Sequence, residues 1–350
     1  MHLVGRLRPG GEMSFQRLIV RWIAGLLLGT LIIAVTSPLF VRSYLPQQLD
    51  PVRRTYVPLS GQDYRWRSEG YATTLIGAHG MPGRGEVPPH NSSSIRVALW
   101  GDSQAEGVCV NDDQKLFTQI ERVAQSRGTS CVVLPFARSG EDASHWLTQM
   151  PSVEQQLEID VHLLAVVDLP DLLAATEAPL PAAMHRGLVG SQSQIAENIP
   201  AFLIQTVRHL VTDEEGHRRQ LRFWVGPQKV VKPEPLVVPE EVDWGAVWQH
   251  TMHTVRAVSE RPIVILYAPI SPHVSAGKIV LHDPQDEPFQ EMERAADAAG
   301  LLVIDARGVL GEAAREGRWP HGFHNGQIGS GHLNAAGYQV IAEQVAGSLP

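Results

Sequence analysis

A serine near the start of the chain's body and a histidine near its end have the residue types and positions best suited to catalysis. Ser103 ends a Gly-Asp-Ser tripeptide that follows the apolar run 95–100. His332 directly precedes the segment 334–349, which has helical spacing. A serine hydroxyl becomes a nucleophile when a neighbouring base takes its proton, and histidine most often supplies that base. The pair suits nucleophilic catalysis, provided that the fold brings the two side chains together.

The elements that must position this pair are predicted by hydrophobic patterning. Short apolar runs alternate with helical patterns, and the runs are 95–100, 131–135, 161–167, 262–268 and 301–304. Continuous apolar strands separated by helices are typical of a parallel sheet covered on both faces. We therefore predict a flavodoxin-like three-layer α/β/α fold with a parallel five-stranded sheet. Such sheets bind ligands at the carboxyl ends of their strands, where Ser103 and His332 are both expected.

The N-terminal part of the chain carries a candidate membrane anchor. Residues 22–41 are apolar and without charge, and a bilayer core needs about 20 such residues. A cleaved signal peptide is the alternative, although no clear cleavage site follows the run. A buried core helix would be amphipathic, and this run is apolar on every side. Arginines lie on both sides of it, so the positive-inside rule only favours a cytoplasmic segment 1–21 and an exported body.

The remainder divides into a lead-in and a domain. Residues 42–94 are rich in Pro, Gly, Ser and Arg, which predicts a linker and an irregular lead-in. Residues 95–350 are predicted to form the domain. The long interval between the third and fourth strands predicts a helical insertion or lid at about 172–260, with a long helix at about 192–212.

Composition excludes some classes of function. The chain has 29 basic and 37 acidic residues among 350, a formal charge of −8, which argues against nucleic-acid binding. The two cysteines are placed at opposite ends of neighbouring strands, so we predict that Cys109 and Cys131 are free thiols. Histidine pairs such as His321 with His324 lack a third ligand, so no metal site is predicted, and the expected chemistry needs no cofactor.

The same residues carry a family resemblance. Over roughly residues 60–350 the chain resembles the SGNH/GDSL hydrolase superfamily, whose first block corresponds to the tripeptide ending at Ser103. The resemblance implies that Ser103 is the nucleophile and His332 the base. It also implies that the backbone N–H groups of Ser103 and Gly140 form the oxyanion hole.

Two phrases resemble a bacterial, membrane-anchored subgroup of that superfamily. They are the segment 66–71 and the segment 322–325, which precedes the Gly-x-Gly-His-Leu-Asn around His332. Some relatives of the subgroup remove or transfer acetyl groups on extracellular polysaccharides. The resemblance therefore implies a single-pass protein of the inner membrane with a periplasmic catalytic body and, for transfer, a membrane acyltransferase partner.

Two departures from the family pattern affect the site. Pro170 stands where the family has the asparagine that completes the oxyanion hole, and Gly329 stands where it has the acid three residues before the histidine. Proline offers neither a side-chain donor nor a backbone N–H. Either His332 acts in a dyad, with a backbone carbonyl orienting its ring, or the acid comes from Asp168, Asp171 or Asp305, among which the sequence does not choose. Asn325 is an alternative source of the missing amide donor.

Two classes of function follow from these observations. The first is a serine esterase or O-acyltransferase that acts on an ester, acetyl being favoured, of an extracytoplasmic carbohydrate or another small ester. The second is a catalytically weak or inactive SGNH-like protein that binds glycan or scaffolds a membrane export complex, which both departures favour. A third, an intracellular lipase-like enzyme at the inner face of the membrane, requires the opposite topology.

Overall fold

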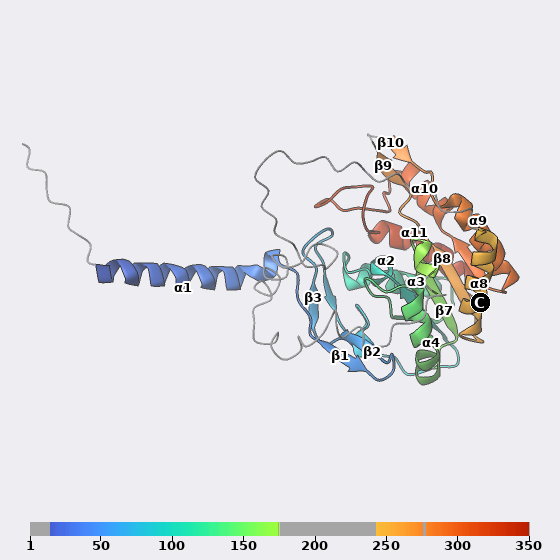
Figure 1. The fold of residues 1–350 in the computed structure, drawn as a ribbon, viewed down its shortest axis with the longest axis horizontal. Coiled ribbons are helices and arrows are strands. Elements are labelled where there is room, and N and C mark those ends of the chain that lie inside the picture. Colours follow the sequence, from blue (N-terminus) through green and yellow to red (C-terminus); the bar gives the residue numbers. More distant parts are fainter. Residues whose placement is uncertain (1–14, 174, 176–242, 276–277, 350) are drawn as a thin grey trace, which may run out of the picture. The chain divides into compact units, whose positions relative to one another are not determined.

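A computed structural model describes residues 15–173, 175, 243–275 and 278–349 (Figure 1). The chain forms two compact units, Met1–Val41 and Arg42–Pro350. In the first, helix α1 (Phe15–Phe40) contains nearly all of the predicted span 22–41 and is long and apolar enough to cross a membrane. A signal sequence near the N-terminus would pass the same test of length and composition.

The second unit is built on the predicted five-stranded parallel sheet. Its strands are β5 (Ile95–Gly101), β6 (Cys131–Pro135), β7 (Val161–Val166), β8 (Ile263–Tyr267) and β11 (Leu302–Asp305). They lie in the order β11-β8-β7-β5-β6, and every neighbouring pair is parallel. Numbered along the domain, this is the flavodoxin-like order 2-1-3-4-5, so the predicted fold class is confirmed.

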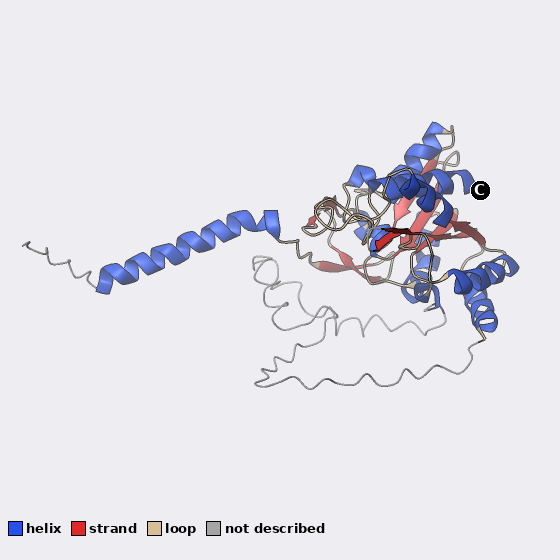
Figure 2. Cartoon of the chain, turned by 90° about the horizontal axis from the view of Figure 1, so that it is seen from above, coloured by secondary structure: helices blue, strands red, loops and turns tan. Residues whose placement is uncertain are grey.

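Helices cover both faces of the sheet because successive strand residues point to opposite sides. In β5, Ala98 and Trp100 belong to one buried core, and Val97 and Leu99 belong to the other. The first core is covered by α4 (Ala143–Leu157), α8 (Trp244–Ala257) and α9 (Asp286–Ala298). The second is covered by α3 (Leu116–Ser126), α10 (Arg307–Arg315) and α11 (Ala335–Ser348). Figure 2 shows the resulting three layers.

Residues 42–94, predicted as a linker and lead-in, belong to the second unit. They contain two antiparallel hairpins, β1 (Gln47–Asp50) with β2 (Thr55–Pro58) and β3 (Asp63–Arg65) with β4 (Thr73–Leu75). The fully buried Arg53 donates to Gln149 Oε1 at 2.6 Å and to the Phe136 carbonyl at 2.8 Å. A buried guanidinium needs such partners, so these bonds hold the lead-in against the domain.

The predicted insertion is described only at its ends. Helix α5 (Pro170–Leu173) follows β7, and α8 precedes β8. The helix predicted at about 192–212 lies outside the described residues. The remaining described elements are the 3₁₀ turns η1 (Ala78–Gly80) and η2 (Asp112–Gln114), the helix α2 (Ser103–Glu106), and the hairpin of β9 (His273–Ser275) and β10 (Lys278–Val280).

Candidate active site

Ser103 lies at the carboxyl end of β5, where the strand turns into α2. The preceding Asp102 caps this helix, and its carboxylate accepts from the Gln104 backbone N–H at 2.8 Å. Aspartate is a favoured cap because it satisfies an amide that has no partner within the helix. Asp102 thus holds the turn, and Ser103 stays partly exposed to solvent.

The structure brings His332 to Ser103 from the opposite end of the chain. The His332 Nε2 and Ser103 Oγ atoms are 3.1 Å apart, within hydrogen-bonding distance. Two further contacts hold the two segments together. Gln104 Oε1 accepts from the Leu333 N–H at 2.8 Å, and the buried Tyr338 hydroxyl donates to the Gln104 carbonyl at 2.5 Å. The residues that flank Ser103 and His332 are therefore bonded to each other.

The carboxylate that orients His332 comes from Glu69, a residue that the sequence analysis did not identify. Glu69 lies in the loop between β3 and β4, and its Oε1 contacts His332 Nδ1 directly. The same oxygen accepts from the His332 backbone N–H at 3.3 Å. A carboxylate on Nδ1 fixes the tautomer that leaves Nε2 free to accept the serine proton. The side chains form a Ser–His–Glu array.

Asn325 holds the Glu69 loop in place. Its side-chain oxygen accepts from the Gly70 N–H at 2.9 Å, and its side-chain nitrogen donates to the Ser68 carbonyl at 2.8 Å. Gly70 packs so tightly that an added Cβ would lie 1.9 Å from the Cys109 carbonyl oxygen. Both ends of the Asn325 amide are engaged, so this residue positions the acid and does not supply the missing oxyanion donor.

A substitution at Gly331 tests whether the position of Glu69 matters for activity. It has a φ of +89°, and an added Cβ would lie 2.5 Å from Glu69 Oε2. We expect Gly331→Ala to displace Glu69 and to lower kcat about 10- to 100-fold, since small misplacements of catalytic groups cost about that much. The matched control is Gly300→Ala. Gly300 has a φ of +72° and nothing within 4 Å of its added Cβ.

Both glycine variants should lose about 1–2 kcal/mol of unfolding free energy from backbone strain. Only Gly331→Ala should lose activity. Equal rates for the two variants, measured by ester turnover alongside thermal unfolding, would contradict the role given to Glu69.

The predicted oxyanion donors lie at adjacent turns. Ser103 is the first residue of α2, and Gly140 follows β6 with a φ of +78°. Between them, Glu106 Oε2 accepts from the backbone N–H of Ser139 at 2.9 Å and from its hydroxyl at 2.8 Å. This contact ties the Gly140 turn to the helix of the nucleophile. In the part of the chain that the structure describes, the Ser103 and Gly140 amides donate to no other residue.

Pro170, which stands where the family has an asparagine, lies after β7 at the start of α5. The next residue, Asp171, is partly buried. Burial raises the pKa of Asp171 to about 7, with repulsion from the neighbouring carboxylates of Asp102, Asp168 and Asp142 adding to the shift. Asp171 is therefore a group that changes charge close to neutral pH.

This raised pKa gives a second prediction. The folded-state pKa of Asp171, about 7, exceeds the ordinary aspartate value of 3.8. The folded state thus binds more protons than the unfolded state between these values, and stability falls as pH rises through that window. We expect Asp171→Asn to melt at a higher temperature than wild type at pH 8, with the difference vanishing near pH 4. Asp297→Asn, at an exposed position on α9, should show no such pH dependence.

Thermal melts of these variants at closely spaced pH values test the assignment. A constant difference between Asp171→Asn and wild type across the range would show that Asp171 does not titrate there.

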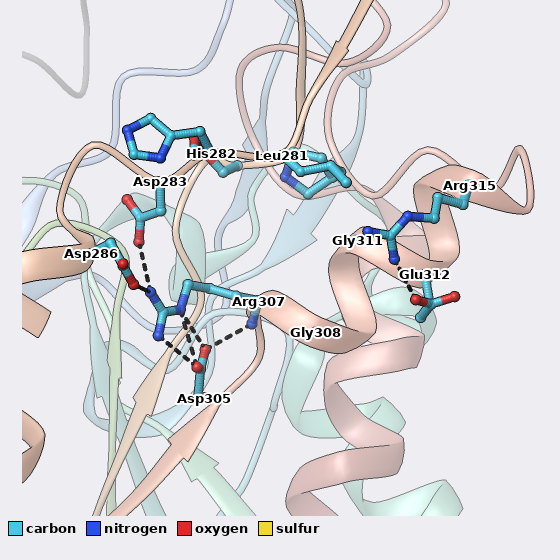
Figure 3. Close-up of a pocket in the computed structure, with 12 residues that line it drawn as sticks. Leu281, His282, Asp283, Asp286, Asp305, Arg307, Gly308, Gly311, Glu312 and Arg315 are labelled. Atoms are coloured by element: carbon cyan, nitrogen blue, oxygen red, sulfur yellow. Dashed lines mark hydrogen bonds and ion pairs between the residues drawn. The ribbon is translucent and has the colours of Figure 1, made fainter. Parts of the chain in front are cut away.

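The two other aspartates predicted as candidates for the acid beside His332 have different partners. Asp168 Oδ1 accepts from Gln285 Nε2 at 2.6 Å. Asp305 binds Arg307, whose Nε and Nη2 donate to its carboxylate at 2.9 and 2.8 Å (Figure 3). The same guanidinium contacts Asp286 and stacks over the ring of Phe289. The acid comes from Glu69 instead, which corrects the prediction of Asp168, Asp171 or Asp305.

The ion pairs of Arg307 belong to a pocket of about 450 Å³ beside α10. Figure 3 shows the Arg307 side chain directed into a ring of carboxylates, with Arg315 paired to Glu312 further along the helix. The charges of this pocket are paired with each other, so it is a structural ion cluster.

A second pocket, of about 440 Å³, borders the Glu69 loop. Its lining includes three aromatic residues, Tyr71, Trp319 and Phe323, together with polar residues such as Asn111 and Gln114. Pockets with apolar walls and a few polar groups suit small organic ligands. This pocket lies beside the acid end of the Ser–His–Glu array.

Comparisons with known proteins extend the description of the fold. No protein-family model matches the chain, and no curated protein sequence matches it. One similar solved structure is LAE5, an α/β hydrolase from the metagenome of Lake Arreo, Spain, with 12% identity, a TM-score of 0.38, and coverage of 73% of this chain and 96% of that one.

Two further solved structures are similar to the same extent. A lipase/acylhydrolase from Enterococcus faecalis has 12% identity, a TM-score of 0.37, and coverage of 72% and 93%. The acetyl xylan esterase AlAXEase has 12% identity, a TM-score of 0.39, and coverage of 73% and 100%. Likeness at this level does not establish a reaction. The chemistry is therefore inferred from the chain's own Ser–His–Glu array, set at the carboxyl edge of a flavodoxin-like sheet.

Proposed function

We propose that this chain is a serine-dependent ester hydrolase or O-acyltransferase. The observation that carries the proposal is the 3.1 Å contact between Ser103 Oγ and His332 Nε2, with Glu69 on the other ring nitrogen. A hydroxyl, a base and an orienting carboxylate in series are the parts that acyl transfer requires. Ser103 is partly exposed, so an ester can approach it.

The proposed reaction has two steps. Ser103 Oγ attacks the ester carbonyl while His332 Nε2 accepts its proton, and the negative oxygen is held by the N–H groups of Ser103 and Gly140. His332 then returns the proton to the leaving alcohol, which leaves an acyl group on Ser103. Water or an acceptor hydroxyl, deprotonated by His332, takes the acyl group in the second step. Pro170 supplies no third donor, and loss of one such donor can lower the rate by about 10²–10³-fold.

We further propose an acetyl ester of a carbohydrate as substrate. The aromatic residues Tyr71, Trp319 and Phe323 line the pocket beside the Glu69 loop, together with amide side chains. Aromatic faces supply contact area and amides supply hydrogen bonds, the combination that a polyhydroxylated ring can use. In the same proposal, α1 anchors the protein in the inner membrane and the catalytic body lies in the periplasm. A membrane acyltransferase is the proposed partner. Reporter fusions after residue 60 test the orientation.

Turnover of a panel of esters by the full chain in detergent tests this proposal. We expect release of acetate from 4-nitrophenyl acetate and from acetylated oligosaccharides, with rates falling as the acyl chain lengthens. An absence of turnover with every ester, together with binding of the oligosaccharides, would contradict the enzymatic proposal and support the glycan-binding alternative.

A further inference from the structure

A set of three potential metal ligands surrounds the base end of the candidate active site. Glu69, Cys109 and His332 each offer one ligand atom, and these three atoms all lie within 4.8 Å of one another. The ligands come from a hairpin loop, from the segment after α2 and from the loop before α11. Because these residues are far apart in the sequence, no spacing motif predicts the set. Their convergence depends entirely on the fold.

The donor set has the chemistry of a zinc site. Thiolate, imidazole and carboxylate are the three side-chain ligand types that Zn²⁺ uses, and thiolate disfavours Mg²⁺ and Ca²⁺. Zinc bonds of about 2.0–2.3 Å require ligand atoms no more than about 4.6 Å apart. Small side-chain movements would therefore close these three ligands around one ion. Zinc sites with three protein ligands commonly complete their coordination with water.

Cys109 is the member of this set that catalysis does not use. Cys109 is 1% exposed and forms no disulfide, and among the described residues it makes no hydrogen bond to Ser103 or Gly140. It also lines the 440 Å³ pocket beside the Glu69 loop. A buried thiol beside an acid–base pair, at the wall of an open pocket, is the second observation that points to a metal.

We propose that Glu69, Cys109 and His332 form an inhibitory zinc site that switches the catalytic base off. The ion would enter between Glu69 and His332, take one lone pair from each, and displace the thiol proton of Cys109 to buffer. Zinc on Nε2 blocks the lone pair that faces Ser103. Zinc on Nδ1 leaves the proton on Nε2, which then donates to Ser103. In both cases His332 does not accept the serine proton, so the ester reaction stops.

The inhibition rests on the proposed function, whereas the zinc site itself does not. The test uses the full chain in detergent, freed of metal with a chelator and then titrated with zinc chloride. Bound zinc is measured by equilibrium dialysis, and ester turnover is measured in parallel. We expect one zinc ion per chain, inhibition that follows occupancy, and full recovery when the chelator is restored.

Cys109→Ser and Cys109→Ala are the diagnostic variants, and Cys131→Ser is the matched control. Cys131 is the other free cysteine and opens β6, away from the set. We expect both Cys109 variants to need at least about tenfold more zinc for half-inhibition than wild type, each measured against its own metal-free rate. Cys131→Ser should behave as wild type. Cobalt bound to wild type should give a thiolate-to-cobalt charge-transfer band that both Cys109 variants lack.

The outcomes separate the zinc site from the enzymatic proposal. Equal zinc inhibition and equal zinc affinity in wild type and both Cys109 variants would overturn the site, even with turnover intact. Stoichiometric zinc binding that depends on Cys109, in a chain that hydrolyses no ester, would support the site and refute the proposed function. Thermal melts without metal confirm that each variant is folded.

Discussion

Replacing Ser103 by alanine should lower ester turnover by about 10³-fold or more. In serine hydrolases, loss of the nucleophile removes the acyl-enzyme route and leaves only what binding and the oxyanion donors contribute. Ser103 is the hydroxyl that contacts the base, with its Oγ 3.1 Å from His332 Nε2. The measurement is kcat for acetyl esters with purified full-length wild type and variant. The fall should appear in kcat more than in KM, because the hydroxyl acts on bond making.

Ser126→Ala is the control for this substitution. Ser126 lies at the end of α3, and its exposed hydroxyl donates to the Val123 carbonyl at 2.7 Å. Its loss should leave turnover unchanged. If Ser103→Ala retains the wild-type rate, the hydrolysis is done by another group or by a contaminant, and the nucleophile assigned to this site is wrong.

Replacing Glu69 by glutamine should lower kcat by about 10²–10⁴-fold. The amide is the same size as the carboxylate but can turn its NH₂ group toward His332 Nδ1. That contact favours the tautomer with the proton on Nε2, which is unable to accept the serine proton. The corresponding acid-to-amide change in a triad costs about 10⁴-fold. The range is wider here because Glu69 also accepts from the His332 backbone N–H, and a glutamine oxygen can keep that bond.

Glu86→Gln is the matched control, since Glu86 is an exposed glutamate in the same lead-in segment. It should turn over acetyl esters at the wild-type rate and melt at the wild-type temperature. A Glu69→Gln variant as active as Glu86→Gln would show that the ring of His332 is oriented without this carboxylate.

The sheet and its catalytic edge were predictable because their signals are local. Each strand is a continuous apolar run, and a fully covered parallel sheet requires such runs. The positions of Ser103 and His332 at one edge then follow from topology, because strands in this order place the first strand's end beside the loops of their neighbours. For the same reason the free state of Cys109 and Cys131 was predicted and is confirmed.

Glu69 was not predictable by the same route. It lies in a short hairpin loop of a segment rich in turn residues, which carries neither a periodic pattern nor a known spacing to His332. The sequence therefore pointed only to carboxylates near strand ends as the acid that orients His332. One signal was present in the sequence. Gly331 precedes His332 and Gly70 follows Glu69. At both glycines an added Cβ would clash with neighbouring atoms.

The packing of the lead-in against the domain was not predictable for a related reason. Its composition resembles that of a linker, yet the guanidinium of Arg53 is buried and bonded to Gln149 and to the Phe136 carbonyl. A single buried arginine is not visible as such in the sequence, because arginine is usually exposed. Glu69 reaches the site from the same lead-in segment.

The central claim is that Ser103 takes up the acyl group of the substrate, and trapping the acyl-enzyme tests it most directly. Wild-type protein is mixed with an activated acetyl ester, quenched in acid within the first turnover, digested, and analysed by mass spectrometry. We predict a single acetyl adduct on Ser103 that is absent from His332→Ala. Acetylation at a different residue, or turnover at the full rate with Ser103 unmodified at every time point, would contradict the claim.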